Sequence, residues 1–246
     1  MFGRKKGKRP MGLEYRNELK YIVSPRQIAV LRNRIRSLMD LDVHTGGRGR
    51  YTIRSVYFDD YRNICYLENE EGTSPREKFR IRIYNADEKA IRLELKRKEG
   101  GKTHKDSCPL TVDQCQAFLA GKGMPCADSD PPVLQKFILK YRTELYRPKV
   151  IVEYDREPYV YKAGNVRVTF DTDIRSSNRV EAFFEKDLFA RPVMPVGCHL
   201  MEVKYDELLP DIIYHSLQTG SLSQETFSKY YLCRRYNIGG VKKNGF

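Results

Sequence analysis

The sequence lacks the cysteine and histidine spacings of a zinc site or a disulfide framework. Its six cysteines, at positions 65, 108, 115, 126, 198 and 233, form no CxxC pair, and its four histidines form no HExxH motif. These spacings are the usual signatures of structural zinc and of zinc hydrolases. We therefore expect reduced thiols and a cytoplasmic protein.

Long apolar runs are also missing. No stretch approaches the ~18 apolar residues needed for a membrane-spanning helix. The basic start MFGRKKGKRP is not followed by the apolar segment of a secretory signal. This pattern argues against secreted and membrane-spanning classes, and residues 1–11 are predicted to form a disordered basic tail.

The motifs of common nucleotide-binding and nucleophilic enzymes are absent as well. The glycine-rich stretch HTGGRGR, residues 44–50, does not have the GxxxxGK[ST] order of a phosphate-binding loop, and we expect a connecting loop there. No Ser/His/Asp or Cys/His arrangement stands out. The chemistry of this chain therefore has to come from other residues.

Basic residues are abundant. Forty-five Lys and Arg against 32 Asp and Glu give a formal net charge of +13 and a pI of about 9.4. Such an excess predicts attraction to a polyanion, which could be nucleic acid, an anionic membrane surface or a phosphate-rich small molecule. Charge alone does not choose among them.

Alternating polarity predicts a protein made mostly of antiparallel strands, with helices between them. The expected strands are 14–23, 52–59, 78–84, 90–98, 149–156, 165–171, 180–185 and 199–205. The expected helices are one that begins at Ser24-Pro25, then 111–120, 132–146, 206–218 and 223–235. No repeat or linker divides the chain, so we predict a single domain over residues 12–236 and a flexible tail over 237–246.

The stretch KFRIRIYNADEKAIRLELKRKEG, residues 78–100, shows what the strands have in common. Because successive side chains point to opposite faces, one row is apolar and the other is charged. The apolar row holds Phe79, Ile81, Ile83, Leu93 and Leu95, and the charged row holds Lys78, Arg80, Arg82, Glu94, Lys96 and Lys98. Taken singly, each strand could present an ordinary solvent-exposed charged face.

Several strands share such basic rows, and like charges on neighbouring strands repel each other. A bound polyanion would relieve this repulsion. The pattern predicts an α+β fold. If its antiparallel sheet closes, with helices packed on the outside, the charged rows point into a polar, basic lumen and no strand edge is left exposed. Glu18, Glu94 and Glu202 would be the few carboxylates inside, suited to holding phosphate chains through a divalent cation.

An ordered set of short motifs carries a family resemblance: ELKY (18–21), SVYFDD (55–60), KFRIRIY (78–84), LELKRK (93–98), VRVTFDT (166–172), MEVKY (201–205) and FSKY (227–230). In this order they resemble the polyphosphate polymerase domain of the vacuolar transporter chaperone (VTC) family, a branch of the CYTH or triphosphate tunnel metalloenzyme fold. The resemblance implies that the sheet closes into an eight-stranded antiparallel β-barrel. It also implies that this tunnel transfers the γ-phosphate of ATP onto inorganic polyphosphate, with Mn²⁺ or Mg²⁺ as cofactor. It also implies pyrophosphate or triphosphate as a primer.

The resemblance also implies roles for individual residues. The phosphate-binding and catalytic positions would be Lys20, Arg80, Arg82, Lys96, Lys105, Arg156, Arg167 and Lys229. Further contacts to the nucleotide or its phosphates would come from Arg54, Lys98, Lys204 and Tyr84. The metal would be held by Glu202, helped by Glu18.

One departure from the fold's hydrolytic members bears on the reaction. Many tunnel triphosphatases begin with ExExK, whereas here the three positions are Arg16, Glu18 and Lys20, and Glu202 is followed by Lys204. Fewer metal-binding acids favour a polymerase over a two-metal hydrolase. The alternatives are a tunnel triphosphatase for inorganic or nucleoside triphosphate, an adenylate cyclase, and a non-catalytic binder of polyphosphate or nucleic acid.

No aromatic stacking platform or helix-turn-helix pattern is visible, so no specific nucleic acid is expected. The chain shows neither the SPX domain nor the membrane helices of the eukaryotic relatives. A separate membrane partner and the oligomeric state are left open.

Overall fold

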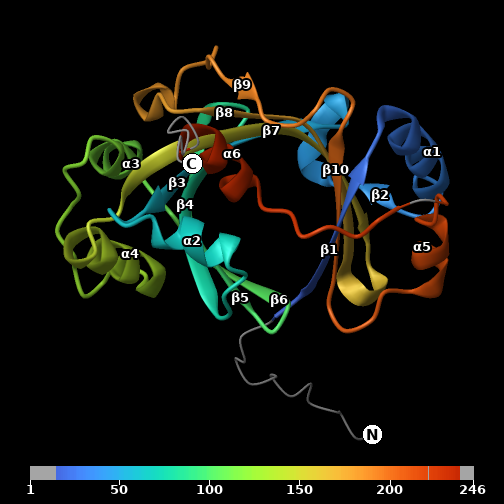
Figure 1. Cartoon of the computed structure of the whole chain (residues 1–246), viewed down its shortest axis with the longest axis horizontal. Helices are drawn as coiled ribbons and strands as arrows, with labels where there is room; N and C mark the ends of the chain where they lie inside the picture. The colour runs from blue at the N-terminus through green and yellow to red at the C-terminus, as the bar shows by residue number, and fades with distance from the viewer. Residues whose placement is uncertain (1–14, 221, 239–246) are drawn as a thin grey trace, which may run out of the picture.

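The computed structural model describes residues 15–220 and 222–238, and its centre is one curved antiparallel sheet (Figure 1). Along the sheet the strands follow the order β1-β10-β8-β7-β3-β4-β5-β6. Their bounds are β1 Asn17–Val23, β3 Tyr51–Asp59, β4 Arg76–Tyr84, β5 Asp87–Glu99, β6 Lys102–Pro109, β7 Arg147–Tyr161, β8 Val166–Ser177 and β10 His199–Tyr205. Two short strands, β2 (Asp40–Leu41) and β9 (Arg191–Pro192), pair with β7 and β8.

The predicted closure of the barrel is wrong. The sheet curls through 220° and is an open half-barrel. Within the described residues, the two edge strands meet at one bridge, where the backbones of Arg16 and Thr103 exchange hydrogen bonds of 2.8 and 3.0 Å. Farther along β1, Tyr21 forms a bridge with Gln224 of a C-terminal segment. The α+β class and the eight antiparallel strands are confirmed.

Helices cover the convex face of the sheet in two groups (Figure 1). On one side α3 (Val112–Leu119) and α4 (Pro132–Thr143) pack on β3, β4, β5 and β7, and on the other α1 (Pro25–Ile35) and α5 (Asp211–Ser216) pack on β1, β8 and β10. The remaining helices are α2 (Ile64–Glu70), α6 (Lys229–Ile238) and the 3₁₀ turns η1 (Val43–Arg48), η2 (Ala163–Asn165) and η3 (Val180–Ala182). No helix in the described ranges has the length and hydrophobicity needed to cross a bilayer.

The first helix begins as its sequence predicts. The Ser24 hydroxyl accepts a hydrogen bond from the Gln27 amide at 3.2 Å, and the Gln27 side chain accepts one from the Ser24 amide at 2.8 Å. Pro25 occupies the first turn. This capping box satisfies two backbone donors at the helix start, so the boundary is local in origin.

The hairpin of β4 and β5 confirms the predicted separation of faces. Asn85 and Ala86 form its two-residue turn with φ of 52° and 54°, the left-handed geometry that suits the twist of paired strands. Phe79, Ile81 and Ile83 are fully buried, and the Phe79 ring lies 5.0 Å from that of Phe137 on α4. The charged row therefore faces the concave side.

Several predicted element boundaries are corrected by the structure. Residues 180–185 are not a strand, because Val180–Ala182 is a 3₁₀ turn whose neighbour Phe183 is buried. Strand β6 and helix α2 were not predicted; β6 buries only Cys108, so its alternation in hydrophobicity is weak. The last helix begins at Lys229 and reaches Ile238, whereas residues 1–11 and 239–246 of the predicted tails lie outside the described residues.

Candidate active site

The concave face of the half-barrel encloses a cavity of about 620 Å³. Thirteen of the fourteen predicted site residues line it: Lys20, Arg80, Arg82, Lys96, Lys105, Arg156, Arg167, Lys229, Lys98, Lys204, Tyr84, Glu18 and Glu202. They come from β1, β4, β5, β6, β7, β8, β10 and α6. Alternation on the strands places them on one face, and curvature of the sheet brings them together.

Arg54 is the predicted site residue that lies elsewhere. Its neighbours on β3, Ile53 and Tyr57, line the cavity, and Arg54 points to the opposite face. There its guanidinium donates to the Glu153 carboxylate and, at 2.9 Å, to the carbonyl of Phe183. The bond to Phe183 anchors residues 180–185, the segment that was wrongly predicted as a strand.

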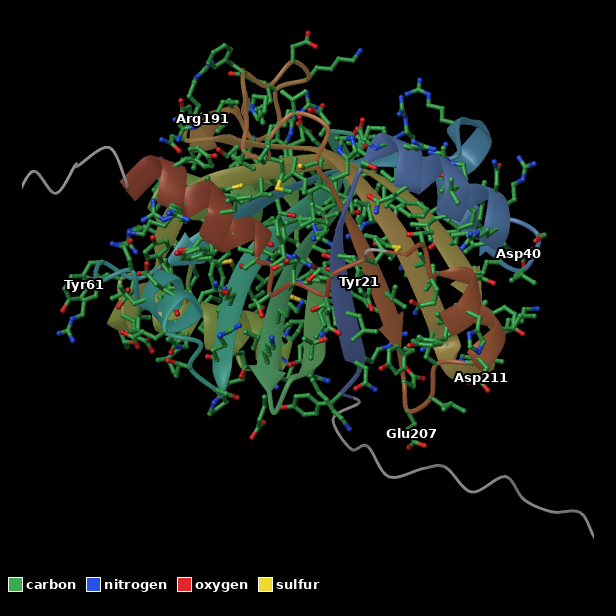
Figure 2. All side chains as sticks on the ribbon, turned by 45° about the vertical axis from the view of Figure 1, so that its right-hand side comes forward. Tyr21, Asp40, Tyr61, Arg191, Glu207 and Asp211 are labelled. Carbon is green, nitrogen blue, oxygen red and sulfur yellow. The ribbon has the colours of Figure 1, made fainter. Side chains whose placement is uncertain are left out.

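A C-terminal segment, residues 224–228, completes the wall of the cavity along the free edge of β1. The Glu225 amide donates to the Lys20 carbonyl at 2.8 Å, and the Lys20 ammonium donates to the Phe227 carbonyl at 2.7 Å. Figure 2 shows this segment crossing β1 near the labelled Tyr21 before it enters α6. Non-sheet backbone therefore closes part of the gap that the half-barrel leaves open.

Glu94 organises the cations of β4 and β6. Its carboxylate is fully buried and lies 2.6 Å from Nη2 of Arg80, 3.0 Å from Nζ of Lys105 and 3.7 Å from Nη1 of Arg82. Burial alone would raise the pKa of Glu94, but Arg80, Arg82 and Lys105 together hold that pKa well below its usual range. Glu94 is therefore ionised and fixes these cations at the cavity wall.

Asp171 plays the same part for β7 and α6. Two hydrogen bonds of 2.6 Å join it to the guanidinium of Arg156, and its carboxylate lies 2.7 Å from Nζ of Lys229. Lys229 also lies 2.6 Å from Glu202. Burial lowers the pKa of Lys229, yet Asp171 and Glu202 more than reverse this, so the pKa is raised. Helix α6 thus delivers a firmly charged ammonium into the cavity.

Glu18 gathers three lysines. Its carboxylate lies 2.8 Å from Nζ of Lys96, 3.2 Å from Nζ of Lys204 and 3.6 Å from Nζ of Lys20. Burial would raise the pKa of Glu18, but Lys96, Lys20 and Lys204 lower it well below its usual range. Burial in turn lowers the pKa of Lys96 to about 7, despite Glu18.

Arg167 is the most peripheral of the predicted arginines in the cavity. Its guanidinium lies 2.8 Å from Asp42, and it donates to the hydroxyl of Tyr51 at 3.0 Å. The Tyr51 ring meets the ring of Tyr84 edge-on, with centroids 5.7 Å apart. This part of the cavity therefore combines a cation with aromatic surface.

Lys78 is a cavity residue that was not among the predicted site residues. Its ammonium donates to Oδ1 of Asn69 at 2.7 Å and lies 5.2 Å from the centre of the Tyr230 ring. Across the described chain no carboxylate lies within ion-pair distance of it. Burial, then the charges of Arg76 and Lys20, lower its pKa to about 7. Its place at the head of the row Lys78, Arg80, Arg82 was the signal that could have identified it.

Two other residues escaped sequence reasoning for different reasons. Asp171 shares a row with Arg167, but a single acid on a strand gave no sign that it would meet a lysine from α6. Asn69 belongs to α2, which was not predicted. Both reach the site only through long-range packing.

A divalent cation would find few protein ligands here. No group of three or more His, Cys, Asp or Glu side chains in the described ranges could hold a metal ion. The predicted ligands Glu18 and Glu202 do face the cavity, and each is already paired with lysine. Their hard oxygen atoms suit Mg²⁺ or Mn²⁺, provided that phosphate oxygens complete the coordination.

The cavity is chemically suited to multiply charged phosphate groups. Arginine forks match pairs of phosphate oxygens, and lysines add point charges between them. No nucleophilic side chain activated by a base is apparent among the lining residues. The arrangement can bind, align and neutralise phosphates.

Comparisons with known proteins agree with this geometry. The VTC domain family matches residues 15–236, and no curated protein matches the chain. A proposed adenylyl cyclase from Hippeastrum with a dominant triphosphatase activity is similar in structure, with a TM-score of 0.52 and 13% identity over 90% of this chain and 96% of that chain. A proposed adenylate cyclase from Bacillus halodurans has a TM-score of 0.46 and 15% identity, over 85% of this chain and 88% of that chain.

At 13% identity and a TM-score of 0.52, the similarity to the Hippeastrum protein shows a shared fold, and the family match identifies the family. The resemblance drawn from the sequence motifs is confirmed. The chain belongs to the VTC domain family.

Proposed function

We propose that the protein is a polyphosphate polymerase that transfers the γ-phosphate of ATP to the end of an inorganic polyphosphate chain. The observation that carries this proposal is the charge balance of the cavity. Seven lysines and six arginines line it among the described residues, against three glutamates, Glu18, Glu202 and Glu225. A wall so rich in cations suits a long chain of phosphates better than a two-metal hydrolytic centre.

The arginines would hold the donor. Arg80 is fixed by Glu94 and Arg156 by Asp171, so their guanidinium groups are held in place before a ligand binds. Preorganised cations that face the transferring group stabilise charge in the transition state without moving. Arg82, which donates to the hydroxyls of Ser55 and Tyr154 in the cavity wall, would add a third guanidinium.

The lysines would hold the acceptor chain. Lys20, Lys96, Lys105 and Lys229 supply ammonium groups from four different elements. The attacking atom would be a terminal phosphate oxygen, which is already ionised, so no protein base is required. A Mn²⁺ or Mg²⁺ ion held by Glu202 and Glu18 would neutralise charge on the donor phosphates.

The experiment is product analysis with ATP, Mn²⁺ and a triphosphate primer. We expect an acid-labile phosphate polymer, with one ADP released for each phosphate added to it. Arg82→Ala should lower the rate at least about 100-fold, since a buried transition-state contact is lost. Arg26→Ala, at an exposed position on α1, is the matched control and should leave the rate unchanged.

A second candidate is a tunnel triphosphatase, favoured by the fold shared with the Hippeastrum protein and its dominant triphosphatase activity. Release of phosphate and ADP with no polymer, at any primer length, would establish this candidate and exclude the polymerase. Binding of triphosphate with no turnover would exclude both.

A further inference from the structure

Lys204 stands between two carboxylates that come from neighbouring strands. Its Nζ lies 3.2 Å from Oε1 of Glu18 and 3.3 Å from Oε2 of Glu202. Lys204 is the cross-strand partner of Glu18 and lies two residues from Glu202 on β10, so the three side chains share one face. Both glutamate side chains are 6% exposed, and that of Lys204 is 27% exposed.

No other described cation has this position. Lys96 and Lys20 are ion-paired with Glu18 and not with Glu202. Lys229 and Arg156 are ion-paired with Glu202 and Asp171 and not with Glu18. The ammonium of Lys204 is therefore the one that joins the two carboxylates.

Two carboxylates that converge on one point are what a hard divalent cation requires from a protein. The charges of Glu18 and Glu202 repel each other, and a cation between them relieves that repulsion. In this chain Lys204 is the ammonium between the two carboxylates, and it adds to the cations that pair with each carboxylate separately. A metal ion could use both carboxylates only by displacing it.

We propose that Lys204 occupies a latent divalent-cation site formed by Glu18 and Glu202, and thereby prevents the free protein from binding metal before its phosphate ligand arrives. Metal then enters together with the phosphates, whose oxygens complete its coordination and also attract the displaced ammonium. Lys204 is a specificity-determining residue in this scheme. The inference rests on the proposed function only in taking a phosphate chain as the ligand.

The test is a Mn²⁺ titration without nucleotide or phosphate, in which the electron paramagnetic resonance signal of free Mn²⁺ reports binding. We expect weak binding by the unmodified protein. Lys204→Met keeps an unbranched side chain of similar length without the charge, and should bind one Mn²⁺ on the order of tenfold or more tightly, since a unit charge beside two carboxylates is removed. Its thermal midpoint should rise with Mn²⁺.

Two variants separate a built site from a general change in charge. Lys96→Met also removes a cation beside Glu18, but it does not touch Glu202, and it should gain much less affinity for Mn²⁺. Adding Glu202→Gln to Lys204→Met should abolish the gain. If Lys204→Met does not fold, as judged by circular dichroism, Lys204→Gln provides the same test.

Equal Mn²⁺ affinity of the unmodified protein and Lys204→Met would overturn the inference, as would a gain that survives Glu202→Gln. Because the titration contains no ATP, its outcome is independent of the reaction. If Lys204→Met gains Mn²⁺ affinity as expected while the unmodified protein makes no polymer from ATP, the proposed function is disproved and this inference stands.

Discussion

Arg156 on β7 and Asp171 on β8 are cross-strand partners, joined by two hydrogen bonds of 2.6 Å in the wall of the cavity. Arg156 lines the cavity and can face a ligand, while the buried carboxylate of Asp171 compensates its charge. Asp171 is also close to Lys229, so one acid fixes cations from a strand and from the last helix. Asp171 is therefore expected to contribute both to the stability of the fold and to ligand binding.

Asp171→Asn should destabilise the fold by about 3 kcal/mol, because removal of one partner leaves buried cations uncompensated. The measurement is urea denaturation followed by circular dichroism. Asp173→Asn on the same strand is the matched control, since Asp173 is exposed and has a left-handed φ of 51° that asparagine tolerates. We expect the control to stay within about 0.5 kcal/mol, and equal losses in the two variants would contradict this account of Asp171.

Arg156→Lys should weaken binding of tripolyphosphate by about tenfold or more, because an ammonium cannot form two parallel hydrogen bonds with Asp171 and still offer a fixed fork to phosphate. Isothermal titration calorimetry would measure the dissociation constant. Arg26→Lys, at an exposed position on α1, is the control for replacing a guanidinium by an ammonium outside the cavity. An unchanged affinity in Arg156→Lys would show that the fork does not reach the ligand.

Arg54→Met should cost about 2–4 kcal/mol of stability, because Glu153 then loses its buried hydrogen-bonded partner. It should leave the tripolyphosphate affinity of the folded protein within about twofold, since Arg54 does not line the cavity. Comparison of unfolding and binding in one preparation tests both statements. If Arg54→Met loses much of its affinity for tripolyphosphate and keeps its free energy of unfolding, Arg54 belongs to the binding site after all.

Binding of a phosphate chain should take up protons near pH 8. The pKa values of Lys78 and Lys96 are lowered to about 7, so both are largely neutral at pH 8 in the free protein. A polyanion favours their charged forms and raises both pKa values, so affinity should fall as the pH rises above 7. Calorimetry in two buffers of different ionisation enthalpy gives the uptake, expected to approach about one proton per lysine.

Lys78→Met should reduce the proton uptake on phosphate-chain binding by about one proton, the contribution expected from Lys78. The same variant should be more stable than the unmodified protein at pH 7, and this advantage should shrink as the pH rises toward 10. The sign follows because the unfolded chain keeps its lysine protonated up to about pH 10.4, whereas the folded state releases that proton near pH 7. Stability curves that run in parallel across this range would contradict the shift.

Much of the site could be predicted from the alternation of residues. The spacing of Arg80 and Arg82 against Phe79 and Ile81 separates two faces of a strand, because the side-chain period of a strand is two. The start of α1 could be predicted for a similar reason, since Ser24 and Gln27 satisfy each other's backbone groups within one turn. Both features depend only on residues close together in the chain.

The sequence by itself determined which side chains share a face, which segments form strands in most cases, and that the shared face is basic. Tertiary structure alone decided that the sheet is an open half-barrel, that Arg54 belongs to the opposite face, and that Lys229 meets Asp171. The reason is physical: curvature, edge pairing and contacts between distant segments depend on how the whole sheet packs, and no local period records them.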